Sequence, residues 1–170
     1  MKVGITSDLL QQQQQGKLDV VFGKQCSRVT DEGDLLWEEP LVWAFNSKAV
    51  LADDGPLPLA VFPEPCVYRE AAIRALSGAG RPWRLAFESS SMAGCISAAL
   101  AGFAIAPLAR SQLREGLIAL GPAEGLPPLA SARFYAFYDK TESPLRALVD
   151  AVKEIGRRRR FIAQSFQTTG

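Results

Sequence analysis

Three short apolar runs separated by two helix-like segments form the clearest pattern in the chain. The runs cover residues 59–62, 83–87 and 103–108, and each is too short to be a helix. Segments 66–76 and 92–101 carry small and apolar side chains near helical spacing, and glycines follow both segments. This alternation predicts three parallel strands with helices on the faces of their sheet, the first strand being buried on both faces.

The N-terminal segments predict a similar start. Residues 2–5 are strand-like, Ser7 and Asp8 are suitable N-caps for a short helix at 9–15, and the apolar run at 18–22 predicts the next strand. In the same way, Ser89, Ser90 and Ser91 offer N-caps to the helix at 92–101.

Further strands are predicted at residues 35–37, 41–45, 117–120 and 132–138. The last helix is predicted from Ser143 and Pro144, a cap followed by proline at the first helical position. One face of this helix is apolar and consists of Leu145, Leu148, Val149, Val152 and Ile155.

Composition restricts the possible functions. The chain has 170 residues, of which 48% are hydrophobic and 22% charged, as expected for a globular protein, and its formal charge of +1 gives no electrostatic indication of nucleic-acid binding. Histidine is absent, which removes the commonest general base and metal ligand, so we expect no catalysis, cofactor or metal. Cys26, Cys66 and Cys95 have no CxxC spacing, and neither a signal peptide nor a membrane span is evident, which favours a reducing cytoplasm.

Candidate binding residues follow from the predicted architecture. In open α/β sheets ligands lie beyond the carboxyl ends of the strands, where helix N-termini present free N–H groups to small carboxylates or other anions. The candidates on this basis are Thr6, Ser7, Phe62, Pro63, Pro65, Cys66 and Val67. An alternative stays open for two of them, because Ser7 could serve only as a helix cap and Phe62 only as core.

Two stretches, FPEPCVYREAAIRAL and GRPWRLAFESSSMAGCISAALAGFAIAPL, resemble the second half of the effector-binding domain of LysR-type transcriptional regulators. TSDLLQQQQQGKLDVVF and LLWEEPLVWAF resemble earlier parts of the same domain, so the likeness covers nearly the whole chain. The resemblance implies an α/β fold like that of type 2 periplasmic binding proteins, with two lobes of parallel or mixed sheets flanked by helices. The first lobe would comprise residues 1–46 and 136–170, and the second residues 47–135.

The same resemblance implies a small-molecule effector bound between the lobes, contacting Thr6, Ser7 and residues 65–67. Tyr68 and Arg69 lie one step further into the helix, where they could reach the effector or belong to the helix surface. A homodimer is also implied, with DNA bound only through an N-terminal region that this chain lacks. The first strand and helix of the first lobe are expected to be absent too, which would leave a sheet edge bare near residues 1–22.

Three other interpretations compete with an effector-binding domain. The two-lobed architecture also suits a stand-alone solute-binding protein, although such proteins carry export signals. A truncated dimerisation module without a ligand is the second. The third is an enzyme or redox sensor that uses Cys66, at a helix start where a thiolate would be stabilised, although its usual histidine base is missing. Cys95, within a helix of small residues, is expected to be buried.

Overall fold

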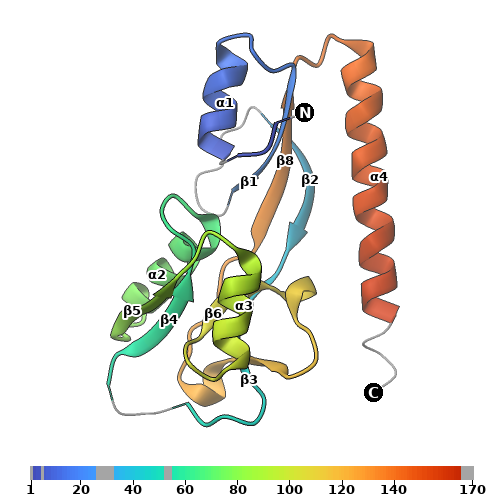
Figure 1. Cartoon of the computed structure of the whole chain (residues 1–170). Helices are drawn as coiled ribbons and strands as arrows, with labels where there is room; N and C mark the ends of the chain where they lie inside the picture. The colour runs from blue at the N-terminus through green and yellow to red at the C-terminus, as the bar shows by residue number, and fades with distance from the viewer. Residues whose placement is uncertain (1, 5, 26–32, 52–54, 166–170) are drawn as a thin grey trace. The chain divides into compact units, whose positions relative to one another are not determined.

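The computed structural model (Figure 1) describes residues 2–4, 6–25, 33–51 and 55–165, except for the side chains of residues 158–165. The chain divides into two compact units, of which the first is Met1–Glu38 with Arg133–Gly170 and the second is Glu39–Ala132. The strand β3 (Leu41–Asn46) therefore lies in the second unit, whereas the sequence-based boundary near residue 46 assigned it to the first lobe.

A three-stranded sheet forms the centre of the first unit. Its strand order is β1 (Val20–Gln25), β8 (Ala132–Tyr138) and β2 (Asp34–Glu39), and β1 runs antiparallel to β8. The strand predicted at residues 2–5 is not observed at residues 2–4, and Ile5 lies outside the described residues. An extended segment becomes a strand only when a neighbour pairs with its backbone, and this sheet contains no strand from that segment.

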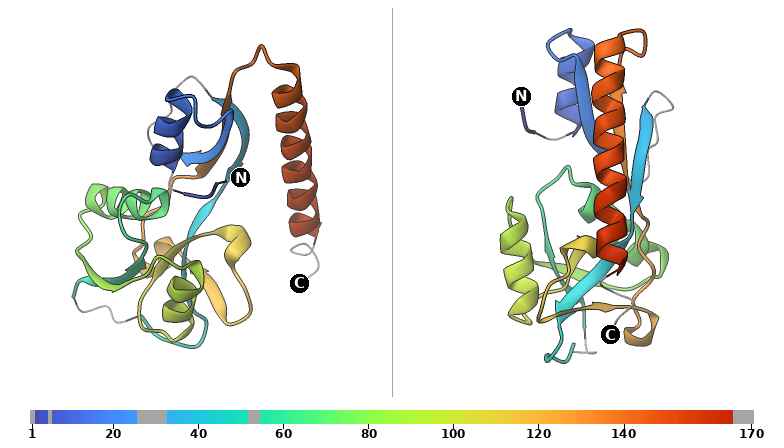
Figure 2. Two further views of the ribbon diagram at one scale, coloured as in Figure 1. Left: turned by 45° about the horizontal axis from the view of Figure 1, so that its top comes forward. Right: turned by 90° about the vertical axis from the view of Figure 1, so that its right-hand side faces the viewer.

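Two helices cover opposite faces of this sheet (Figure 1). Leu9 of α1 (Thr6–Gln14) packs against Val21, Tyr135 and Phe137, whereas Val149 of α4 (Ser143–Ser165) packs against Ala136 on the other face of β8. The predicted final helix is confirmed, and it runs through 23 residues without a break (Figure 2).

The strand-helix alternation predicted for the second unit is confirmed. Its elements are β4 (Leu57–Val61), α2 (Val67–Gly78), β5 (Trp83–Glu88), α3 (Met92–Leu100) and β6 (Ala106–Ala109). β4 is parallel to β5 on one side, and on the other it bonds to Ile105, which lies just before β6. Backbone hydrogen bonds of 2.8 Å join Ala60 N–H to the Ile105 carbonyl and Ile105 N–H to the Pro58 carbonyl.

The other sheet of the second unit has three strands in the order β6, β3, β7. β3 pairs antiparallel with β6 and with β7 (Leu117–Leu120), so this sheet is antiparallel, whereas β4 and β5 form a separate parallel pair. One core cluster joins α3 to Ala60 and Leu108, and the other joins α2 to Leu59 and Trp43. Two short 3-10 turns, η1 (Arg110–Gln112) and η2 (Pro122–Glu124), complete the unit. Within the described residues, no helix is both long and apolar enough to cross a membrane.

The contact between α4 and β2 depends on a glycine. Trp37 of β2 stacks on Phe134 of β8 with ring centroids 4.7 Å apart, and a Cβ added at Gly156 of α4 would lie 2.6 Å from Trp37 Cε3. The helix can approach the sheet at this point because residue 156 has no side chain.

We predict that Gly156→Ala lowers the free energy of unfolding by about 1–3 kcal/mol, because the stacked Trp37 ring must shift to admit a methyl group. Urea unfolding followed by circular dichroism measures the change. Gly78→Ala is the matched control, since an added Cβ there meets nothing within 4 Å and a helical glycine costs about 0.5–1 kcal/mol relative to alanine. If both variants gain stability, the proposed close contact is wrong.

Candidate functional site

The carboxyl ends of β4 and β5 lie at one edge of the second unit, because the two strands are adjacent and parallel. Cys66 is the N-cap of α2, with extended backbone angles of φ −141° and ψ 126°. The first N–H bonded within this helix belongs to Glu70, which donates to the Cys66 carbonyl at 2.9 Å. The start of a helix, before its first helical hydrogen bond, is suited to an anion or a polar group.

The start of α3 lies after β5 at the same edge. Ser91 is the N-cap of α3, as the triple serine predicted, but its side chain makes no capping hydrogen bond. Instead, the Ser91 N–H donates to Ser89 Oγ at 3.1 Å, so the serine hydroxyl stabilises the turn before the helix.

Arg69 connects the ends of both strands. Its Nη1 donates to the Phe62 carbonyl at 3.1 Å and to Glu88 Oε2 at 2.6 Å, and its Nε lies 3.3 Å from Glu64 Oε1. Only 14% of the Arg69 side chain is exposed, against 43% for Glu88 and 71% for Glu64. The guanidinium is therefore held in place by the fold and does not extend into solvent.

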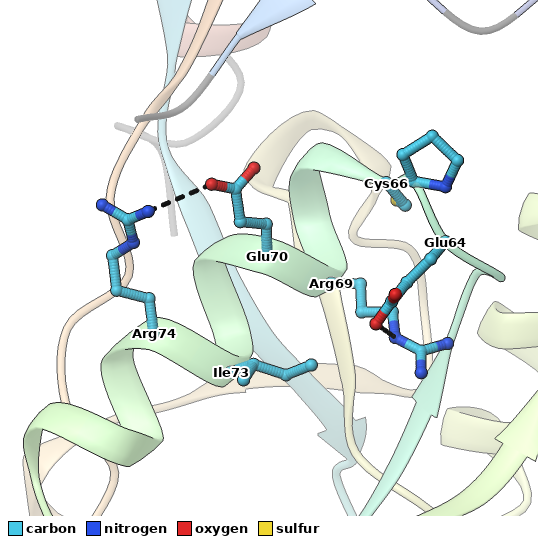
Figure 3. Close-up of a pocket in the computed structure, with 7 residues that line it drawn as sticks. Glu64, Cys66, Arg69, Glu70, Ile73 and Arg74 are labelled. Carbon is cyan, nitrogen blue, oxygen red and sulfur yellow. Dashed lines mark hydrogen bonds and ion pairs between the residues drawn. The ribbon is translucent and has the colours of Figure 1, made fainter. Parts of the chain in front are cut away.

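A pocket of 530 Å³ opens on the solvent face of α2 (Figure 3). We call it the α2 pocket; it is lined by Glu64, Pro65, Cys66, Arg69, Glu70, Ile73 and Arg74. Arg74 forms an ion pair of 3.1 Å with Glu70, one helical turn earlier. The pocket therefore has two ion pairs on its walls, Arg69 with Glu64 and Arg74 with Glu70, and Ile73 lies between them (Figure 3).

The candidates on the first unit occupy the start of α1. Thr6 is the first helical residue, and its Oγ1 accepts a hydrogen bond of 3.2 Å from the Lys24 N–H near the end of β1. Ser7 lies inside the helix instead of capping it, and its Oγ contacts Asp8 Oδ1 at 3.3 Å. The helix begins earlier than predicted because serine and aspartate are tolerated in a first turn, where a carboxylate also interacts well with the helix dipole.

The remaining candidates differ in accessibility. Pro63 and Pro65 are exposed, with a cis Glu64–Pro65 peptide, and Val67 is half-buried at the first position of α2. Phe62 is half-buried and packs against the core cluster on the α3 side. Tyr68 is only 5% exposed, so its ring belongs to the buried face of α2 and not to the surface.

The two described cysteines have different environments. Cys66 is half-buried, whereas Cys95 is buried, and burial, followed by the nearby Cys66, raises the pKa of the Cys95 thiol to about 11. Cys95 is thus a protonated thiol at neutral pH, which makes it a poor nucleophile. Cys26 lies outside the described residues, and among those described no three His, Cys, Asp or Glu side chains form a group that could hold a metal ion.

Sequence reasoning missed five of the side chains at this end of the second unit. These are Glu64, Glu70, Ile73, Arg74 and Glu88. The spacing of Glu70 and Arg74, one helical turn apart, was a usable signal. No local signal connects Glu88 to Arg69, because their contact depends on the pairing of β4 with β5.

The sequence matches the family model of the LysR substrate binding domain over residues 1–157. It is 30% identical over 127 residues to the HTH-type transcriptional regulator PecT of Dickeya dadantii, covering 72% of this chain and 38% of PecT. It is 31% identical over 140 residues to the HTH-type transcriptional regulator DgdR of Burkholderia cepacia, covering 81% of this chain and 46% of DgdR. The chain thus spans less than half the length of these curated relatives.

Solved structures agree on the fold. The bromide-bound regulatory domain of HypT from Salmonella typhimurium has a TM-score of 0.66 at 17% identity, covering 89% of this chain and 78% of that domain. The CcmR regulatory domain of Synechocystis PCC6803 in complex with 2-PG has a TM-score of 0.66 at 17% identity, and the match covers 91% of this chain and 81% of that domain. The fold is that of the LysR regulatory domains, which is the type 2 periplasmic-binding-protein-like fold. The chain belongs to the LysR substrate binding domain family.

We predict that Arg69→Ala lowers the free energy of unfolding by about 1–3 kcal/mol, because it leaves the Phe62 carbonyl and the Glu88 carboxylate without their donor. The partial exposure of Glu88 limits the loss. Arg74→Ala is the matched control; it removes an exposed ion pair within one helix and should cost about 0.3–0.5 kcal/mol. Urea denaturation compares the two, and equal losses would contradict a connecting role for Arg69.

Proposed function

We propose that this chain is the effector-sensing part of a LysR-type transcriptional regulator and performs no catalysis. The observation that carries the proposal is the family match over residues 1–157, in a fold whose second unit presents two helix starts at the ends of two parallel strands. The lack of histidine and the buried, protonated Cys95 thiol support a role without catalysis.

The effector in this proposal is a small anion, for which a carboxylate is the simplest model. The start of α2 favours negative charge, because the positive end of the helix dipole lies there. Two structural relatives are named with a bound ligand, a bromide ion in HypT and 2-PG in CcmR. They support a ligand in domains of this fold without identifying the one bound here.

Each unit, taken separately, carries candidate effector contacts. The first unit provides Thr6 and Ser7 at the start of α1. The second provides Phe62, Pro63, Pro65, Cys66 and Val67 around the start of α2. In this proposal Arg69 positions the loop after β4, since its guanidinium already bonds to Phe62 and Glu88, and Tyr68 is part of the core.

The wider assignment concerns the whole regulator. We propose that it works in the cytoplasm and binds DNA through a separate N-terminal domain, with this chain supplying the response to the effector. One of the structural relatives, DarR of Vibrio fischeri, was solved in complex with DNA and matches 89% of this chain with a TM-score of 0.68 at 12% identity.

We predict that Val67→Asp weakens the binding of any small carboxylate that stabilises the parent protein by about tenfold or more. A carboxylate at the first position of α2 repels an anion bound at the helix start, and tenfold corresponds to about 1.4 kcal/mol. Thermal-shift titration of a panel of acetate, succinate, benzoate and related acids measures the effect, because a ligand raises the melting temperature according to its affinity.

Val50→Asp is the matched control for the Val67 substitution. It introduces the same charge at an apolar position that is 93% exposed, and it should leave carboxylate affinity unchanged. If a carboxylate binds Val67→Asp as tightly as the parent protein, the effector site does not lie at the start of α2.

We also predict that the chain self-associates at micromolar concentration. β1 is an edge strand of the first-unit sheet, Phe22 on it is exposed, and α4 exposes Leu148 and Ile155. Unpaired strand edges and exposed apolar side chains are commonly covered by another chain. Sedimentation velocity measures the mass, and a single species of 18.4 kDa across the concentration range would show that these surfaces remain uncovered.

A further inference from the structure

The Arg69–Glu64 pair on the wall of the α2 pocket is incomplete. Arg69 Nε is buried and has no hydrogen-bond acceptor within the part of the chain that the structure describes, although Glu64 Oε1 lies 3.3 Å away. The two charges are therefore at ion-pair distance without a directed hydrogen bond. A buried donor without an acceptor is destabilising, so a better-aligned acceptor at this position is favourable.

Glu64 is the partner that another group can most easily replace. Its side chain is 71% exposed, so the Glu64 carboxylate returns readily to water when another group takes its place. Glu88 is held more firmly, since its Oε2 accepts a hydrogen bond of 2.6 Å from Arg69 Nη1. A ligand carboxylate would thus replace Glu64 on Arg69 while Glu88 keeps its place.

The charges around the pocket distinguish between classes of ligand. If a simple anion displaces Glu64 from Arg69, the Glu64 carboxylate is left without a partner next to the bound anion. A simple cation would instead be repelled by the guanidinium groups of Arg69 and Arg74. A ligand that carries both charges close together avoids both penalties, because its carboxylate pairs with Arg69 and its ammonium with the displaced Glu64. An α-amino acid has this arrangement of charges.

The rest of the pocket suits an amino acid with an apolar side chain. Ile73 is half-buried between the two ion pairs (Figure 3), and it provides an apolar surface within reach of a ligand held by Arg69. The volume of 530 Å³ accommodates a small amino acid without moving the helix.

We propose that the α2 pocket binds a free α-amino acid with an apolar side chain, which inserts between Arg69 and Glu64. This inference rests on the proposed function, because Pro65, Cys66 and Arg69 belong to both the pocket and the proposed effector region. It goes further by naming the chemical class of the ligand, a zwitterion rather than a simple anion, and the ion pair that the ligand rearranges.

Nuclear magnetic resonance titration of the whole chain tests the proposal. The probes are L-leucine, its anionic derivative N-acetyl-L-leucine and its cationic derivative L-leucine methyl ester, followed through the backbone amides of residues 66–74. L-leucine is expected to bind at least ten times more tightly than either derivative. Equal or weaker binding of L-leucine would overturn the proposal.

Glu64→Gln provides the decisive variant. This substitution removes the carboxylate that would pair with the ligand ammonium, so it should weaken L-leucine binding about tenfold. N-acetyl-L-leucine should bind more tightly to this variant, because residue 64 no longer competes for Arg69. Glu70→Gln is the matched control; it also removes one carboxylate from the pocket wall, but from the pair with Arg74, and should leave the preference for L-leucine in place. Both side chains are exposed, so neither change threatens folding.

The outcomes separate this inference from the proposed function. If N-acetyl-L-leucine binds as tightly as L-leucine and Val67→Asp weakens both, the anion site at the start of α2 stands and the zwitterion inference fails. If Glu64→Gln inverts the preference while Val67→Asp changes nothing, the amino-acid pocket stands and the effector site at the helix start fails. An unchanged preference in Glu64→Gln refutes insertion between Arg69 and Glu64.

Discussion

The parallel pairing of β4 with β5 determines where the second unit presents its polar groups. The register places Val61 opposite Glu88, so both strands end at one edge of the sheet, and the chain starts a helix soon after each of them. The starts of α2 and α3 therefore lie at that edge together. Arg69 holds the arrangement, because one nitrogen of its guanidinium bonds to the carbonyl after β4 and to a carboxylate at the end of β5. The α2 pocket exists beside this contact and depends on it.

Local patterns were enough to predict most of the fold. The apolar runs and helical spacings between residues 59 and 108 are confirmed because each element there is stabilised largely by its own sequence and its immediate neighbours. The predictions that depended on distant partners were less accurate. Residues 2–4 have the sequence pattern of a strand, but the structure shows no strand there. β3 lies in the second unit because it pairs with β6 and β7. Pairing between distant segments leaves no periodic signal in either of them.

The candidate site was predictable to a similar extent. The start of α2 could be located from a strand that ends before two prolines, whereas the contact of Arg69 with Glu88 could not, since it joins residues on different elements. Tyr68 is a case where the signal was present. It precedes Ala71 and Ala72 by three and four positions, which places it on the same helix face as those two buried residues, and the structure confirms that it is buried.

The charges around the start of α2 show why a helix N-terminus alone does not decide which ligand binds. The helix dipole contributes roughly half a positive charge at this end. The three ion pairs near this end join Glu64, Glu70 and Glu88 to Arg69 and Arg74, and these five side chains carry a net charge of 2 − 3 = −1. The dipole offsets only about half of that negative charge, so the local field favours an anion only when a carboxylate moves away. Since Glu64 is the most exposed of the three, ligand binding and the rearrangement of its ion pair become a single event. Selectivity then depends on which ligand leaves the fewest charges without a partner. It is therefore determined by the whole group of charged side chains and not by the helix N-terminus alone.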